Sequence, residues 1–229
     1  MKRLGLVTIG QAPRVDLTPD LEPLLPGIEI IERGALDHLS NEEIAALVIA
    51  DGDEVLVSRL RDGSSAVFGR EHILPQIQAA ITELENHPEH PVDAILLACA
   101  GEFPQFEHKT LFLRPDAMME QVLSALSRDL HTVGLICPLP EQVDFIVQSM
   151  KSVCTQVIGE AASPYTQGLD AAVAAANRLV DRGAQLLVGF CMGYTEEMRG
   201  AVQRATGLPV VLVRSVSARL AAEVLQPVD

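Results

Sequence analysis

Two cysteines close matching apolar segments of the chain. Cys99 ends the run DAILLACA before Ala100 and Gly101, and Cys191 ends QLLVGFC before Met192 and Gly193. A thiolate can remove a proton from carbon, and a thiol can return one. A small ligand held between these two thiols would lose a proton on one face and gain one on the other. The pair therefore predicts stereoinversion, isomerisation or decarboxylation next to a carboxylate, with Cys99 and Cys191 as catalytic residues.

One of the two thiols has a better environment for ionisation. Thr195, Glu196 and Glu197 follow Cys191 and have the composition of a helix start, and a helix N-terminus lowers the pKa of a nearby thiol. The segment GEFPQFEHK after Cys99 is typical of a loop. If one thiol of the pair is inert, we expect it to be Cys99.

A substrate carboxylate and its enolate also need hydrogen-bond donors, which glycine-containing loops supply through backbone N–H groups. Arg14, shortly after the first strand, could grip a carboxylate with two parallel bonds. The candidate binding residues share a position in loops after predicted strands: Thr8, Gly10, Gln11, Arg14, Ala100, Gly101, Met192, Gly193, Tyr194 and Thr195.

Each of these residues also has a structural explanation. A cysteine at a strand end is commonly a small buried hydrophobe. Cys137 ends a strand before Pro138 at a position that we align with Gly10, and we assign it to loop packing. Cys154 is interpreted as structural.

The sequence lacks the motifs expected for metal binding, nucleotide binding, nucleic-acid binding or membrane insertion. The four cysteines show no CxxC spacing, which argues against a metal. There is no GxGxxG after a strand and no GxxxxGK[ST], so no cofactor is expected. A net charge of −14 would repel a phosphate backbone, which argues against nucleic acid as a partner. The longest apolar runs are strand-length, so no membrane span is expected. The apolar part of MKRLGLVTIGQAPR is too short for a signal peptide, and we expect a cytoplasmic protein.

The elements that would position these residues alternate along the chain. Near-continuous Val/Ile/Leu runs separated by helical patterns are typical of parallel sheets covered on both faces, and so of an α/β fold. The predicted strands are 4–10, 28–34, 93–100, 109–113, 131–137, 155–160, 185–191 and 209–213. The predicted helices are 40–50, 71–87, 116–129, 140–150, 168–182, 195–206 and 216–226.

Helix caps and one turn support these boundaries. Ser40 and Glu43 have capping-box spacing, and Gly207 falls where helix-ending glycines are common. The segment 54–70 breaks the alternation, because two strand-like runs flank a turn at Asp62-Gly63, and it predicts a β-hairpin insertion. Its Arg59 and Arg61 are either solvated or contact a ligand or partner subunit.

The two halves of the chain resemble each other. The segment 4–16 matches 133–144, LLACAGEF matches LVGFCMGY, and Arg114 and Arg214 follow equivalent strands. A period of about half the chain predicts two pseudo-symmetric lobes. We place the lobes at 1–114, completed by the C-terminal helix 216–229, and at 115–215. Ligands bind at the carboxyl ends of parallel strands, so the active cleft is expected between the lobes.

The segments LVTIGQAPRVD, LLACAGEF and CMGYTEEMRGAVQRATGLPVVLVRSVSARLAAEVL resemble the AroM family over essentially the whole chain. That family is similar to the aspartate/glutamate/hydantoin racemase superfamily. The resemblance implies a racemase-like fold of two pseudo-symmetric α/β lobes, no cofactor and a homodimer. It also implies that Cys99 and Cys191 correspond to the two racemase cysteines. The usual Cys-Asn-Thr and Cys-Thr-His contexts are replaced here by Cys-Ala-Gly and Cys-Met-Gly-Tyr.

Two functions stay open at this point. The first is a cofactor-independent racemase, isomerase or decarboxylase that acts on a small carboxylate or amino-acid-like ligand. The second is a non-catalytic protein of the AroM family that binds a small carboxylate or serves a regulatory role. The retained thiol pair favours the enzyme, and the altered contexts favour the binding protein.

Overall fold

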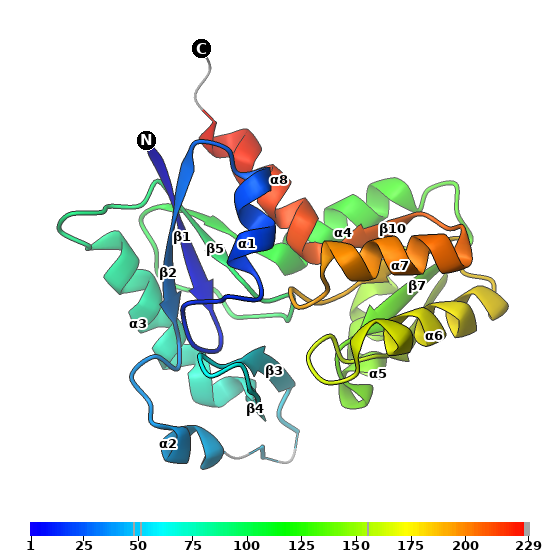
Figure 1. The fold of residues 1–229 in the computed structure, drawn as a ribbon, viewed down its shortest axis with the longest axis horizontal. Coiled ribbons are helices and arrows are strands. Elements are labelled where there is room, and N and C mark those ends of the chain that lie inside the picture. The colour runs from blue at the N-terminus through cyan, green and yellow to red at the C-terminus, as the bar shows by residue number, and fades with distance from the viewer. Residues whose placement is uncertain (48, 51, 155, 227–229) are drawn as a thin grey trace. The chain divides into compact units, whose positions relative to one another are not determined.

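The computed structural model describes residues 1–47, 49–50, 52–154 and 156–226. The chain forms two compact units (Figure 1). The first comprises Met1–Pro115 and the segment from Ser217 onward, and the second comprises Asp116–Val216. Val48, inside the predicted helix 40–50, Thr155, at the start of a predicted strand, and residues 227–229 of the predicted last helical segment lie outside the described residues.

The first unit is built on a parallel four-stranded sheet of order β2-β1-β5-β6. The strands are β1 (Lys2–Thr8), β2 (Ile28–Gly34), β5 (Ala94–Leu97) and β6 (Leu111–Leu113). The apolar run AILL of β5 is fully buried, as expected for an inner strand covered on both faces. This sheet brings the loop after β1 beside the loop after β5, which carries Cys99.

Helices of the first unit are mostly short. They are α1 (Thr18–Leu21), η1 (Glu22–Leu24), α2 (Asn41–Ala45), η2 (Arg70–Ile73) and α3 (Leu74–Glu85). The predicted capping box between Ser40 and Glu43 is present. The helix that it starts is shorter than predicted, because α2 ends at Ala45 and the chain soon reaches Gly52 with φ +89°. The longest of these helices, α3, packs on β1 and β2 (Figure 1).

The predicted insertion is an antiparallel hairpin of β3 (Val55–Arg59) and β4 (Ser65–Gly69). Gly63 in its turn has φ +85°, a conformation that favours glycine. The hairpin lies directly against the loop after β1, since a Cβ on Gly10 would be 2.3 Å from the Arg59 carbonyl oxygen. Gly10 therefore allows two backbones to meet.

The second unit repeats the plan with order β8-β7-β9-β10, again parallel. Its strands are β7 (Thr132–Cys137), β8 (Gln156–Ala161), β9 (Leu186–Gly189) and β10 (Val210–Leu212). Its helices are α4 (Pro115–Leu126), α5 (Pro140–Met150), α6 (Gly168–Asp181) and α7 (Glu196–Thr206). The last helix, α8 (Val213–Leu225), passes from the second unit into the first at Ser217.

Strand order confirms the predicted pseudo-symmetric α/β fold, because β1, β2, β5 and β6 take the places of β7, β8, β9 and β10. The register corrects one alignment. Val7 pairs with Leu97 two residues before Cys99, and Ile136 pairs with Gly189 two residues before Cys191. Cys137 is therefore equivalent to Thr8 and not to Gly10. The proline-containing loops that follow have different lengths, which hid this equivalence.

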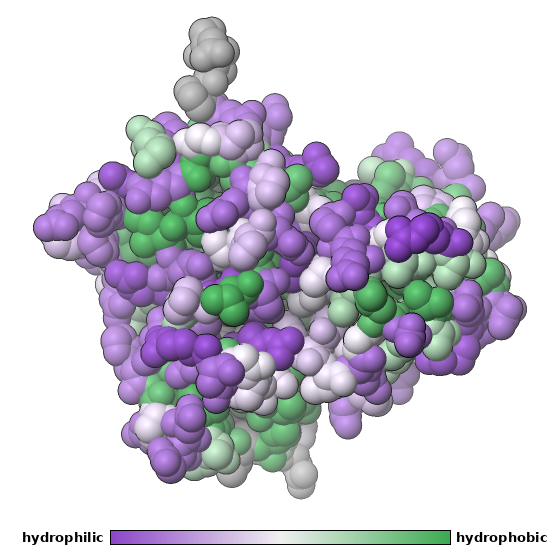
Figure 2. Space-filling model, viewed as in Figure 1, coloured by the Kyte–Doolittle hydropathy of each residue, from purple (hydrophilic) through white to green (hydrophobic). Residues whose placement is uncertain are grey.

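The face shown in Figure 2 is mostly hydrophilic, with apolar side chains gathered in small separate areas. Among the helices that the structure describes, none has both the length and the apolar character needed to cross a membrane.

Candidate functional site

Cys99 lies in a tight turn at the carboxyl end of β5. The backbone N–H of Gly101 donates to the Cys99 Sγ over 3.5 Å, and the Cys99 N–H donates to the Leu97 carbonyl oxygen over 2.8 Å. The side chain is partly buried against the core that includes Phe103 and Phe106. The turn therefore presents a sulfur that already accepts one backbone hydrogen bond.

Cys191 lies in an equivalent turn after β9. The Gly193 N–H donates to the Cys191 Sγ over 3.4 Å, which repeats the arrangement at Cys99. A second group reaches this sulfur, since the Tyr165 hydroxyl lies 3.6 Å from it. Hydrogen bonds to a sulfur favour its charged form. The internal repeat thus extends from strand order to the hydrogen bonding of the two thiols.

The other thiol and phenol near Cys191 are held neutral. Burial, together with the neighbouring Cys191, raises the pKa of the Cys137 thiol to about 12. The same two causes raise the pKa of the Tyr194 phenol well above its usual value. At neutral pH both groups carry their protons, so neither competes with Cys191 to be the anion.

The turn that carries Cys191 leads into the start of a helix, as predicted. Thr195 is the N-cap of α7, and its hydroxyl oxygen accepts the Met198 N–H over 3.2 Å. The predicted binding residues of this turn are largely enclosed: Met192 and Tyr194 are both 1% exposed. The Tyr194 hydroxyl donates to the Ala162 carbonyl oxygen over 2.7 Å. This buried hydrogen bond joins the Cys191 turn to the segment that follows β8.

Two arginines, one after β6 and one after β10, donate hydrogen bonds to the segments that follow the two cysteines. Arg114 Nη2 donates to the Phe103 carbonyl oxygen over 2.9 Å. Arg214 is 1% exposed, and its Nε donates to the Met192 carbonyl oxygen over 2.8 Å. These two residues were aligned by the sequence repeat, and each binds a main-chain oxygen of the segment that follows its own unit's cysteine.

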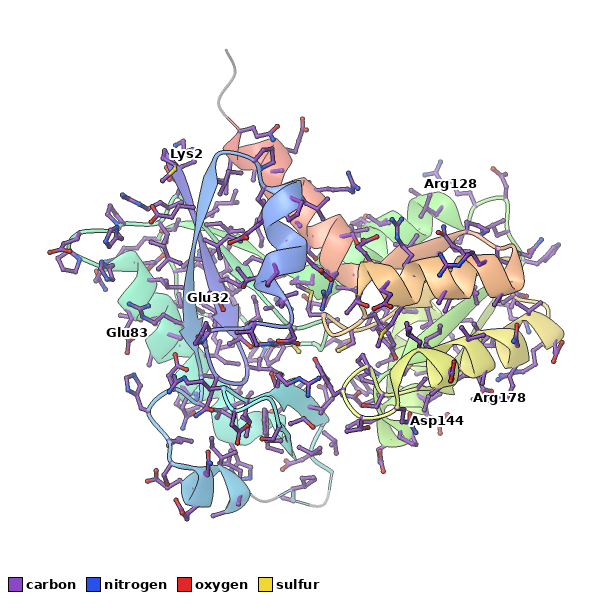
Figure 3. All side chains as sticks on the ribbon, in the orientation of Figure 1. Lys2, Glu32, Glu83, Arg128, Asp144 and Arg178 are labelled. Carbon is purple, nitrogen blue, oxygen red and sulfur yellow. The ribbon has the colours of Figure 1, made fainter. Side chains whose placement is uncertain are left out.

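The loop after β1 places Arg14 inside the first unit. Arg14 is 1% exposed, and its Nε and Nη2 bind the two carboxylate oxygens of Asp16 over 2.7 and 2.8 Å. Its Nη1 donates to the Thr8 hydroxyl over 2.8 Å. Its backbone N–H donates to Glu32, which is labelled on β2 in Figure 3. The bidentate carboxylate predicted for Arg14 is thus supplied by the protein itself.

Gln11 joins the loop after β1 to the hairpin. Its Oε1 accepts the Arg61 N–H over 3.1 Å, and its Nε2 donates to the Leu36 carbonyl oxygen over 3.3 Å. Arg61 also donates from Nε to the Ala12 carbonyl oxygen over 2.7 Å and pairs with Asp37. Arg61 is therefore a link within the first unit, while Arg59 binds the Gly63 carbonyl oxygen in its own turn.

A carboxyl group lies against the Cys99 turn. A Cβ on Gly101 would be 3.2 Å from Glu54 Oε1, and the side chain of Glu54 is 10% exposed. Burial raises the pKa of Glu54 above its usual value, although the adjacent Arg70 acts in the opposite direction. Arg70 also donates to the Glu102 carbonyl oxygen over 3.0 Å. Arg70 therefore connects Glu54, just before the hairpin, to Glu102, just after the Cys99 turn.

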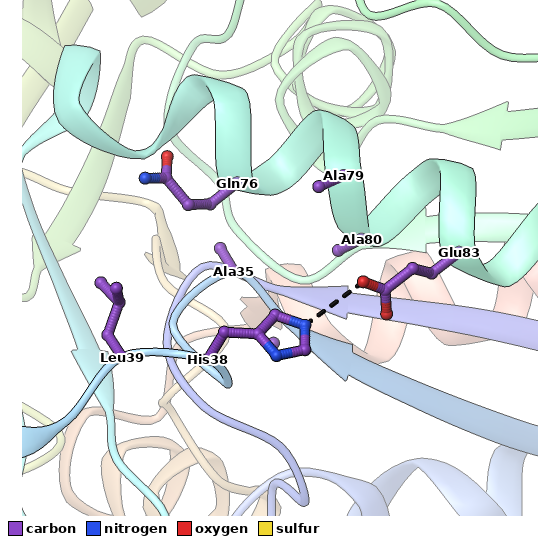
Figure 4. A pocket seen from close by; sticks show the side chains of 8 residues that line it. Ala35, His38, Leu39, Gln76, Ala79, Ala80 and Glu83 are labelled. Carbon is purple, nitrogen blue, oxygen red and sulfur yellow. Dashed lines mark hydrogen bonds and ion pairs between the residues drawn. The ribbon is translucent and has the colours of Figure 1, made fainter.

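A separate small pocket lies between α3 and the loop after β2 (Figure 4). His38 Nε2 is 3.2 Å from Glu83 Oε1 across it. It contains no cysteine and none of the predicted site residues. Among the described residues, no group of three or more His, Cys, Asp or Glu side chains is placed to hold a metal ion.

The predicted site residues fall into two groups, each at the carboxyl end of a parallel sheet. The group in the first unit, at the ends of β1 and β5, comprises Thr8, Gly10, Gln11, Arg14, Cys99, Ala100 and Gly101. The group in the second unit, after β9, comprises Cys191, Met192, Gly193, Tyr194 and Thr195. Sequence reasoning missed Tyr165 and Glu54. Both sit in loops or at a hairpin start, where no periodic pattern marks them; only their position after β8 and before β3 hints at the site.

Comparisons with known proteins agree with this architecture. The family model described as AroM protein matches residues 4–225. No curated protein matches the sequence. An unliganded arylmalonate decarboxylase is similar in structure with a TM-score of 0.63 at 12% identity, over 100% of this chain and 94% of the other.

Two further solved structures share the fold. Allantoin racemase from Pseudomonas fluorescens has a TM-score of 0.55 at 16% identity, over 97% of this chain and 90% of the other. A cysteine-to-serine mutant of Nocardia farcinica maleate cis-trans isomerase, which carries a covalently bound succinylcysteine intermediate, has a TM-score of 0.57 at 17% identity. That match covers 98% of this chain and 93% of the other. The fold is therefore racemase-like.

Proposed function

This chain belongs to the AroM family, and from that premise we propose that it is a cofactor-independent enzyme of the racemase or isomerase type. Its substrate is a small carboxylate, and Cys99 and Cys191 are its acid/base pair. The observation that carries the proposal is the repeated thiol turn. Each sulfur follows an equivalent strand and accepts an N–H from a glycine two residues later.

Chemistry seen in proteins of similar fold supports this assignment. Maleate and arylmalonate, named in two of those structures, are carboxylates, and the isomerase structure contains a cysteine bonded to a succinyl group. Identities of 12% and 17% carry over the fold and not the substrate. The proposal that this chain catalyses similar chemistry therefore rests on its own two thiols, Cys99 and Cys191.

The reaction follows from one thiolate and one thiol. The thiolate removes the proton from the carbon next to the substrate carboxylate, forming an S–H bond, and the C–H electron pair moves into an enolate. The other thiol then delivers its proton to the opposite face of that carbon and becomes a thiolate. The product has inverted configuration, and the two cysteines have exchanged protonation states.

Backbone donors hold the substrate in this proposal. The side chains of Arg14 and Gln11 are engaged within the first unit, and the Gly101 and Gly193 N–H groups donate to the two sulfurs. We therefore assign the carboxylate and enolate oxygens to the other backbone N–H groups of the thiol turns, those of Ala100 and Met192. Arg14 then acts by fixing Thr8 beside the Cys99 turn.

Solvent deuterium exchange tests the chemistry. Chiral 2-substituted carboxylates and amino acids are incubated with the protein in heavy water, and label at the carbon next to the carboxylate is measured by NMR. We expect exchange with inversion for at least one compound, lost in Cys99→Ala and in Cys191→Ala. Cys154→Ala is the matched control, because Cys154 is a buried thiol just before β8, at the end of the second sheet opposite the Cys191 turn.

The alternative predicts a different result. A non-catalytic carboxylate-binding protein would be stabilised thermally by a member of the same panel without any exchange of label. Exchange that survived both cysteine replacements would also overturn the proposal. The requirement that both thiols reach one carbon is tested by a short crosslinker with two alkylating ends, each of which loses halide when a thiolate attacks it. The crosslinker should join Cys99 to Cys191, and bound substrate should block the reaction.

A further inference from the structure

We propose that Tyr165 is a positioning residue that hydrogen-bonds the Cys191 thiolate, so that Cys191 is the ionised thiol of the resting protein and Cys99 is protonated. The role of this state in turnover rests on the proposed function. The protonation states themselves are a property of the folded chain and are measured without a substrate.

Packing fixes the Tyr165 ring against the thiol turn. A Cβ on Gly193 would be 2.7 Å from Tyr165 Cζ, so glycine is what allows the ring to lie there. The ring comes from a loop of its own, where the Tyr165 N–H donates to Ser163 Oγ and the Ser163 N–H donates to Gln167 Oε1. The hydroxyl, 3.6 Å from Cys191 Sγ, is therefore held in place by the end of β8 and the start of α6.

Two donors then converge on one sulfur. The Gly193 N–H and the Tyr165 O–H both reach Cys191 Sγ, and a charged acceptor forms stronger hydrogen bonds than a neutral one. The start of α7, capped by Thr195, follows within the same turn and adds positive potential. Both features favour the thiolate over the thiol.

Two titratable groups that interact with Cys191 in the second unit do not reverse this preference. Cys137 on β7 and Tyr194 in the thiol turn are buried, and both keep their protons at neutral pH. Arg214 at the start of α8 brings a positive charge to the Met192 carbonyl oxygen. The acids in the first turn of α7 are Glu196, which pairs with Arg199, and Glu197.

The side chain next to the Cys99 turn is a carboxyl group, whereas the side chain next to the Cys191 turn is a phenol. Glu54 Oε1 lies against Gly101, and a carboxylate near a thiol disfavours the thiolate. Arg70 pairs with this carboxylate and offsets part of its charge. The two half-sites thus share a backbone donor to sulfur and differ in the side chain beside it, a phenol in one and a carboxyl group in the other.

Alkylation by iodoacetamide measures the two thiols separately, because the labelled peptides are distinguished by mass spectrometry. We expect Cys191 to react faster than Cys99 at pH 7. Tyr165→Phe keeps the ring and removes the hydroxyl. It should slow Cys191 about two- to fivefold at pH 7, because a pKa rise of one unit removes that share of the thiolate from a group that is mostly ionised in the parent protein. The rate at high pH, where every exposed thiol is ionised, should be nearly unchanged. Cys99 in the same sample is the internal control.

A second measurement guards against an altered structure in the variant. The ultraviolet absorbance of thiolate is titrated in the parent protein and in Cys191→Ala, and the difference between them gives the Cys191 transition directly. Faster labelling of Cys99 at pH 7, or a Tyr165→Phe rate for Cys191 that is unchanged or equally slowed at every pH, would overturn the proposal. Failure of deuterium exchange would instead count against the proposed function alone.

Discussion

Replacing Arg14 by methionine tests whether this arginine serves the fold or the substrate. Its guanidinium is 1% exposed and makes two hydrogen bonds to Asp16, with a third to the Thr8 hydroxyl. Methionine fills most of the same volume without the charge. Asp16 would then keep a carboxylate that lacks its bidentate partner.

The expected cost follows from burial. Removing one member of a buried ion pair costs about 3–5 kcal/mol, and the side chain of Asp16 is 20% exposed, which places this pair at the lower end of that range. The lost bond to Thr8 adds about 1 kcal/mol. We therefore expect Arg14→Met to lower the free energy of unfolding by about 3–4 kcal/mol, a large part of the stability of an ordinary domain.

Urea unfolding of a double-mutant cycle measures this. Asp16→Asn removes the partner charge, and the double variant Arg14→Met/Asp16→Asn should be more stable than the sum of the single losses implies, by about 2 kcal/mol. If Arg14 instead gripped a substrate and contributed little to the fold, Arg14→Met would cost under about 1 kcal/mol. A coupling energy near zero would also refute the reasoning.

Three further outcomes are expected. Tyr194→Phe removes the donor to the Ala162 carbonyl oxygen and should lower the free energy of unfolding by about 1–2 kcal/mol in urea, and an unchanged stability would contradict this. Gly193→Ala places a methyl group 2.7 Å from the Tyr165 ring, so the ring must move and alkylation of Cys191 at pH 7 should slow; an unaltered rate would show that the ring contact is unimportant. The folded-state pKa of Glu54 is raised above its usual 4.5, so lowering the pH through that pKa should stabilise the parent protein relative to Glu54→Gln. Urea unfolding at pH 7 and pH 4.5 checks this, and a difference that does not change with pH would exclude it.

The fold was largely accessible from sequence because its strands are buried on both faces. Inner strands such as β5 and β9 are short continuous apolar runs, and helices such as α6 bury Ala172, Ala175, Ala176 and Leu179 at helical spacing. The hairpin was recognisable from one Asp-Gly turn. Helices α1 and η1 were not predicted from the sequence, because a helix of four residues or fewer in a proline-containing segment shows no hydrophobic periodicity.

The candidate site was accessible only where the chain repeats itself. Cys99 and Cys191 emerged as a pair through their matching contexts, and the structure shows equivalent turns around them. The pairing of Arg14 with Asp16 could not be anticipated, because residues two apart face each other only in particular loop conformations. Tyr165 was hidden for a similar reason: its approach to Cys191 joins segments 26 residues apart.

The path of α8 gives the two units different chain connectivity. Residues 116–216 form one unit from a continuous stretch, whereas the first unit needs the segment from Ser217 onward to return to it. Closing a loop of about 100 flexible residues costs about 4 kcal/mol of chain entropy. If the second unit folds first, the separation of the loop ends is already fixed and most of that entropy is already lost. The first unit therefore gains the segment from Ser217 onward only after the whole of residues 116–216 has been synthesised, although its other elements come first in the chain.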